Sequence, residues 1–221
     1  MSFRLSLLAA LISAACFIGG SQSAQANYFV WTDPDTGMTL SYPDTWMRIN
    51  NQKPGDKLSV ALPSGDDKAT CKVHVQEDKR FLYFPGRYHD AVQKVAYSTD
   101  FWSDIFASYS NVKVHRYLDG AGFGRGLGSY ALITYDEKFP ETEQAMAGIM
   151  LVSLYHDDAY VATCSAKAAG FDRWRGYFGS FISSIEFKKV HHELFIGEYR
   201  DFLNDINLIF TREDGLESTR Y

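Results

Sequence analysis

The residues from Met146 to Ile185 constrain the fold of this chain more than any other stretch. They predict an apolar strand at Met146–Tyr155, a tight turn at His156–Asp158 and a return strand at Ala159–Ser165. A helix at Phe171–Ile185 follows, because its apolar residues recur at the spacing that places them on one helix face. A strand pair and an amphipathic helix each need another element on which to bury an apolar face. We therefore expect a sheet packed against this helix.

The predicted helix is unusually aromatic on its apolar face. The residues on that face are Phe171, Trp174, Phe178, Phe181, Ile182 and Ile185. We expect all of them to lie in the core, so that replacing Trp174 by alanine would cost about 3–5 kcal/mol.

The chain before this stretch predicts further antiparallel strands and one long helix. The strands are Tyr28–Trp31, Met38–Tyr42, Lys57–Leu62, Ala69–Gln76, Val112–Tyr117 and Ser129–Tyr135. Turn-forming residues at Asp33–Gly37 join the first two strands into a hairpin. A helix is expected at Tyr88–Tyr109, with a kink or break at Ser98–Asp100, because serine, threonine and aspartate prefer caps to helix interiors. Trp46 is expected to close one end of the core.

The N-terminus has the features of a secretory signal peptide. Arg4 precedes an apolar segment at Leu5–Gly19, and Ala24–Ala26 is a small-residue cleavage site. The apolar segment is short for a membrane span. We expect cleavage after Ala26, which makes residues 1–26 the signal peptide and the protein periplasmic or secreted, with no stable membrane span. An uncleaved signal that anchors the protein in the membrane is the alternative.

The charge of the chain argues against two classes of partner. The formal net charge is −5, and removal of residues 1–26 takes away one base and no acid, which leaves −6. Nucleic acids and anionic membrane surfaces require a clustered basic face. No such cluster occurs in the sequence, so neither partner is expected.

Two cysteines remain after signal cleavage, Cys71 and Cys164. An even number of cysteines in an exported protein favours a disulfide. Closing a loop of about ninety residues would stabilise the fold by about 4 kcal/mol in the chain-entropy model. Two buried free thiols are the alternative.

A glycine-rich run at Gly120–Gly128 is the most distinctive local motif. It lacks the Lys-Ser/Thr ending of a phosphate-binding loop, and a strand follows it where a dinucleotide fingerprint needs a helix. It predicts a mobile or bulged connection between two strands. The functional alternative is a flexible binding loop with Phe123 and Arg125 at its tip. The residues of that candidate loop are Gly122, Phe123, Gly124, Arg125 and Gly126.

No other motif in the sequence indicates catalysis, a metal or a cofactor. The adjacent His191–His192 pair is expected in a solvated linker, and His74 and His115 lie in strands with no carboxylate partner visible in the sequence. No serine lies in a nucleophile elbow, and neither mature cysteine starts a helix. An anion-binding groove would have to be lined by Arg80, Arg87, Arg116 and Arg125, but surface arginines scattered in this way are common.

The segment Gly37–Trp46, Gly-Met-Thr-Leu-Ser-Tyr-Pro-Asp-Thr-Trp, together with the order of elements, resembles the PsbP-like superfamily, which includes DcrB-type bacterial envelope proteins. The resemblance covers residues 28–187. It implies an α+β fold, in which one antiparallel sheet of about six to seven strands is sandwiched by helices. It also implies a binding or assembly module and carries over no catalytic residue.

The tail and the glycine run depart from this resemblance. Residues 188–221 predict an extra C-terminal helix at about 192–206, which could mediate self-association. The chain therefore divides into a signal peptide (1–26), a PsbP-like domain (27–187) and a helical tail (188–221). We expect a non-enzymatic module that binds an envelope protein or a small ligand. The alternative is a small hydrolase-like enzyme with its site near Gly120–Gly128.

Overall fold

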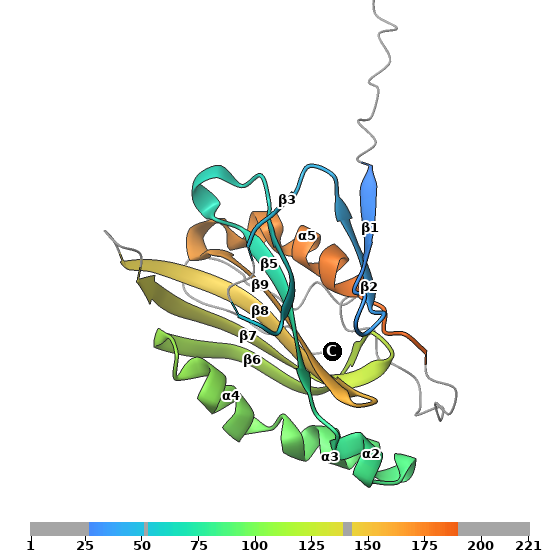
Figure 1. Ribbon diagram of the computed structural model, residues 1–221. Coiled ribbons are helices and arrows are strands. Elements are labelled where there is room, and N and C mark those ends of the chain that lie inside the picture. Colours follow the sequence, from blue (N-terminus) through green and yellow to red (C-terminus); the bar gives the residue numbers. More distant parts are fainter. Residues whose placement is uncertain (1–26, 51–52, 139–142, 190–221) are drawn as a thin grey trace, which may run out of the picture.

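A seven-stranded antiparallel sheet forms the centre of the protein (Figure 1). The computed structural model describes residues 27–50, 53–138 and 143–189. The strand order across the sheet is β3-β4-β5-β9-β8-β7-β6. The strands are β3 (Met47–Arg48), β4 (Asp56–Ala61), β5 (Thr70–Glu77), β6 (Ser110–Phe123), β7 (Gly126–Lys138), β8 (Glu143–Tyr155) and β9 (Asp158–Lys167).

One face of the sheet is covered by α5 (Phe171–Ser183) and by a separate hairpin of β1 (Tyr28–Thr32) and β2 (Thr39–Pro43). The backbone of Thr39 exchanges two hydrogen bonds with Glu186, so the segment after α5 pairs with β2. Trp46 is buried here and stacks against Tyr42 and Phe181, which confirms its expected place at the core.

The opposite face is covered by the consecutive helices α3 (His89–Ala96) and α4 (Thr99–Phe106) (Figure 1). They pack on apolar side chains of β7, β8 and the start of β9. These side chains are Ala131, Ile133, Tyr135, Met146, Met150, Val152, Leu154 and Ala159. The elements before α3 are the short helix α2 (Arg80–Tyr83) and the 3₁₀ turn η3 (Gly86–Tyr88). Further 3₁₀ turns are η2 (Gly65–Asp67) and η4 (Ala168–Gly170).

The predicted fold class is confirmed by this arrangement. The sheet is antiparallel, it has seven strands, and helices lie on both of its faces. The sequence of the predicted strand Ala69–Gln76 alternates apolar and polar residues, and the structure confirms this pattern, because Cys71, Val73 and Val75 are buried while the residues between them lie on the other face. The predicted break in the long helix occurs at Ser98, which occupies the N-cap position of α4.

Three local features differ from what the sequence indicated. Most of Gly120–Gly128 lies in β6 and β7, because the hairpin continues through the run and only residues 124 and 125 turn. The helix α2 was not predicted, since four residues are too few to show a periodic pattern. Trp174 is partly buried and lies at the border of the core, whereas Phe171 and Phe178 are fully enclosed.

Several predictions fall outside the described residues. The signal peptide (1–26) and the tail helix (192–206) lie there, so their structure is not described. Within the described ranges, no helix combines the length and apolar character that crossing a membrane would require.

Candidate functional site

A row of polar side chains lies on the face of the sheet that carries α3 and α4, beyond the area packed under these helices. Lys72 of β5 pairs with Ser59 of β4 and with Thr163 of β9, and Thr70 pairs with Ser165 in the same way. These residues alternate along their strands with buried apolar ones, which is the pattern of a strand with one solvated face. The alternation therefore places hydroxyl and amino groups of three neighbouring strands side by side.

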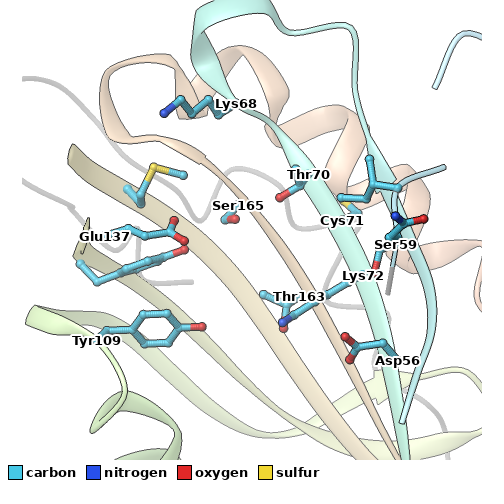
Figure 2. Close-up of a pocket in the computed structure, with 14 residues that line it drawn as sticks. Asp56, Ser59, Lys68, Thr70, Cys71, Lys72, Tyr109, Glu137, Thr163 and Ser165 are labelled. Carbon is cyan, nitrogen blue, oxygen red and sulfur yellow. The ribbon is translucent and has the colours of Figure 1, made fainter. Parts of the chain in front are cut away.

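This polar row forms the floor of a cavity of about 320 Å³ (Figure 2). Tyr109 and Glu137 lie on one side of the cavity in Figure 2, and Tyr135, Asn50 and Lys68 also line it. The rings of Tyr109 and Tyr135 lie with their centroids 4.3 Å apart. The walls belong to different parts of the chain, so the cavity exists only in the folded sheet.

The groups in the cavity include donors of hydrogen bonds and charges of both signs. Burial raises the pKa of the Tyr109 phenol, and the nearby Glu137 carboxylate raises this pKa further. The Tyr109 hydroxyl is therefore protonated at neutral pH and available as a donor. Lys68 and Lys72 bring two ammonium groups to the same cavity.

The acidic residue at the lower end of the cavity, Asp56, has partners within the protein. Its side chain accepts a hydrogen bond from the backbone N–H of Lys53, and its second oxygen lies 2.9 Å from Nδ1 of His74. The sequence showed no carboxylate partner for His74, because the two residues are brought together by the pairing of β4 with β5. The other strand histidine, His115, lies 2.8 Å from the Thr134 hydroxyl, and burial lowers the pKa of His115 to about 4.

The glycine turn holds the end of the described chain in place. Phe123 is only 2% exposed and packs edge-on against Phe187. Arg125 donates a hydrogen bond from Nε to the carbonyl of Phe187 and pairs with Glu186 at 2.6 Å. A side chain at Gly124 would lie 2.6 Å from the Phe187 ring, so glycine is required there. Phe123 is therefore buried, and it does not form the tip of a flexible loop, which was the alternative considered for this run.

The candidate residues of the glycine run are not part of the cavity. Gly122, Phe123, Gly124, Arg125 and Gly126 lie at the start of β7 or before it, while Tyr135 and Glu137 lie near the end of that strand. Two of the arginines considered for an anion-binding groove, Arg80 and Arg87, contact different groups. Arg80 pairs with Asp78, and the Arg87 guanidinium lies over the ring of Tyr88.

Cys71 and Cys164 are joined by a disulfide in the structure. They lie directly opposite each other on β5 and β9, on the face of the sheet that packs against α5. Among the described residues, no group of three or more histidine, cysteine, aspartate or glutamate side chains is placed to hold a metal ion.

A second surface feature is an aromatic segment from Leu82 to Tyr88, at the end of the molecule where β5 leads into α3 (Figure 1). Four of its side chains are large, apolar and exposed. They are Leu82, Tyr83, Phe84 and Tyr88. Tyr83 is 75% exposed, the highest value of these four side chains.

The aromatic segment is held in a fixed conformation. The Nε2 atom of His89 lies 3.1 Å from the carbonyl oxygens of both Phe81 and Phe84, so its N–H donates to them. The His89 ring also stacks on the Phe81 ring with centroids 4.0 Å apart. A backbone hydrogen bond from Tyr88 to Pro85 closes the turn. The backbone that carries the exposed side chains is therefore held by hydrogen bonds and by ring stacking of His89.

Comparisons with known proteins show likeness of structure only. No family model matches the chain, and a search of curated proteins finds no related sequence. The fold is similar to that of cyanobacterial PsbP from Synechocystis, with 13% identity, 77% of this chain and 99% of that chain covered, and a TM-score of 0.47. It is also similar to LpqN of Mycobacterium tuberculosis, a protein involved in cell envelope biogenesis, with 11% identity, 75% and 92% covered, and a TM-score of 0.45. These values concern the fold and assign no activity or partner to this chain.

Proposed function

We propose that this protein is an exported, non-enzymatic module of the cell envelope that binds another protein through the aromatic segment Leu82–Tyr88. The observation that carries the proposal is the exposure of four large apolar side chains within seven consecutive residues. Exposed apolar patches of this kind are typical of interaction sites in soluble proteins. Tyrosine and arginine, both present in the segment, dominate the binding energy of many protein interfaces.

The contacts of His89 should lower the entropy that the aromatic segment loses when it binds a partner. The hydrogen bonds of His89 hold the segment before a partner arrives, so fewer backbone and side-chain conformations are lost on association. The partner that fits this surface is a protein with an apolar patch and a carboxylate placed to meet the exposed guanidinium of Arg87.

The charge of the chain favours a protein over a lipid surface as the partner. Membrane-surface segments combine aromatic residues with a clear excess of basic ones. Here Arg80 is neutralised by Asp78 and Lys79 by Glu77, and the whole chain carries a formal net charge of −5. The segment therefore lacks the electrostatic attraction that binding to anionic lipid needs.

The test is photo-crosslinking in living cells. Tyr83 is replaced by the photoreactive residue benzoylphenylalanine, and the tagged protein is recovered from the periplasmic fraction after irradiation. The matched control carries the same replacement at Tyr177, which is 52% exposed on α5, across the sheet from α3. We expect one discrete protein adduct at position 83 and none at position 177.

A follow-up measurement checks that the adduct reports binding. We expect Tyr83→Ser to weaken the affinity for the identified partner at least tenfold, while Tyr177→Ser leaves it unchanged. Equal adducts at both positions, no adduct at all, or an adduct of lipid at position 83 would each overturn the proposal. Recovery of the protein only from the cytoplasm would overturn its export.

A further inference from the structure

The cavity over the polar row suggests a ligand site that is separate from the aromatic segment. We propose that it binds a small anion, namely the carboxylate or phosphate group of a hydroxyl-bearing molecule, between Lys72 and the hydroxyl groups of β5 and β9. The site does not depend on the protein partner proposed above, because it is lined by different residues.

The position of Lys72 is the first argument. Its side chain is half-buried and lies in the sheet row between Ser59 and Thr163. In Figure 2 its amino group lies beside the side chain of Thr163. Within the residues that the structure describes, this ammonium group is in no ion pair. A half-buried ammonium without a counter-charge favours binding of an anion.

The surrounding donors are the second argument. The hydroxyls of Thr70, Thr163 and Ser165 line the floor, and the Tyr109 phenol, kept protonated by its raised pKa, lines the wall. Hydroxyl donors around one ammonium provide several hydrogen bonds to the oxygens of a carboxylate or phosphate. Lys68, which also lines the cavity, adds to the positive charge there.

Two acidic residues, Asp56 and Glu137, also line the cavity. Asp56 already accepts a hydrogen bond from the backbone of Lys53 and lies beside His74. Glu137 lies at the opposite wall with Tyr109 and Tyr135. The Glu137 carboxylate can accept hydrogen bonds from hydroxyls of the same ligand. The geometry therefore fits a ligand that carries an anionic group at one end and hydroxyl groups at the other.

The volume sets the size of the ligand. About 320 Å³ is at the lower end of the range for small-molecule sites, and it suits a molecule of roughly one sugar ring in size.

The test is a titration of the isotope-labelled protein followed by NMR, at constant ionic strength and pH. The probes are inorganic phosphate, citrate and galacturonate, each added separately. We expect saturable shifts of the backbone amides of Lys72, Thr163 and Ser165 with at least one probe. Saturation with phosphate alone would identify a phosphate-bearing ligand, and saturation with citrate or galacturonate would identify a carboxylate.

Variants distinguish a built site from general attraction to positive charge. We expect Lys72→Gln to raise the Kd at least tenfold and Thr163→Val to raise it about threefold. The matched control is Lys113→Gln, an exposed lysine on β6, which should leave the Kd unchanged. The absence of saturable shifts with all three probes would overturn the proposal. Equal affinities of the Lys72 and Lys113 variants would overturn it as well.

Discussion

At the scale of single residues, a hydrogen bond decides the position of Trp174. Its indole Nε1 donates to Asp67 at 2.8 Å, and Arg173 donates to both oxygens of the same carboxylate. The ring therefore lies at the border of the core, although the helical spacing predicts the same burial for it as for Phe178. Helical periodicity predicts which face of a helix a residue lies on. It does not predict that a polar residue from another part of the chain, here Asp67, contacts that face.

The first prediction compares the free energies of unfolding of variants at Phe178 and Trp174. Phe178→Ala should lower the free energy of unfolding by about 3–5 kcal/mol, because it empties a fully buried position. Trp174→Phe should cost only about 1 kcal/mol, which corresponds to the lost hydrogen bond to Asp67. Urea denaturation of both variants measures the difference. Equal losses would show that the ring of Trp174 is buried as deeply as that of Phe178.

At the scale of elements, the contact between β5 and β9 joins the two halves of the sheet. The strands β3, β4 and β5 come from the first part of the chain, and β6 to β9 follow about thirty residues later. The pairing of β5 with β9 runs over the full length of β5. The Cys71–Cys164 disulfide lies within this pairing and closes a loop of 93 residues.

A second prediction concerns this disulfide. The double variant Cys71→Ala/Cys164→Ala should lose about 4 kcal/mol of unfolding free energy, because the unfolded chain regains the entropy of the open loop. Reduction of the unmodified protein should produce a similar loss in the same urea measurement. Thiol titration of the denatured, unreduced protein should find no free thiol from these two cysteines, and two free thiols would contradict the bond.

The elements also show where sequence patterns stop being informative. The alternation in β5 and the turn at His156 were predictable, because period-two burial and turn-forming residues are local properties. The glycine run was predicted as a mobile or bulged connection between two strands, since glycines weaken the preference for a strand. The pairing of β6 with β7 does shift register between Asp119 and Ala121. In the structure these residues remain in β6 and β7, because pairing along the hairpin outweighs that local preference.

At the scale of the whole molecule, the segment after α5 closes the fold. Phe187 is 1% exposed, and its ring packs against Tyr155, Tyr160 and Phe123. Glu186 extends the small β1–β2 sheet through Thr39. Residues from both ends of the described domain therefore meet at the glycine turn.

The last prediction follows from this closure. A chain that ends at Lys189 should remain folded and monomeric, because it keeps the buried Phe187 and the backbone pairing of Glu186 with Thr39. Phe187→Ala should lose about 3–5 kcal/mol of unfolding free energy. Urea denaturation and analytical ultracentrifugation measure both effects. An unfolded product after truncation at Lys189 would make the tail part of the core, and a full-length oligomer beside a truncated monomer would assign self-association to the tail.

The sequence by itself indicated most strands and helices and the alternating burial of β5, because local periodicity and turn chemistry are carried in every short window. The α+β fold class rested on the resemblance carried by Gly37–Trp46 and the order of elements, and the disulfide rested on the even number of cysteines. Only the tertiary structure decided where function could lie. The cavity combines Lys72, Thr163 and Tyr109 from strands and a helix end far apart in the sequence, and register and packing alone bring them together. The exposure of Tyr83 is likewise a tertiary property, since an aromatic residue in a sequence is equally compatible with a core and with a surface.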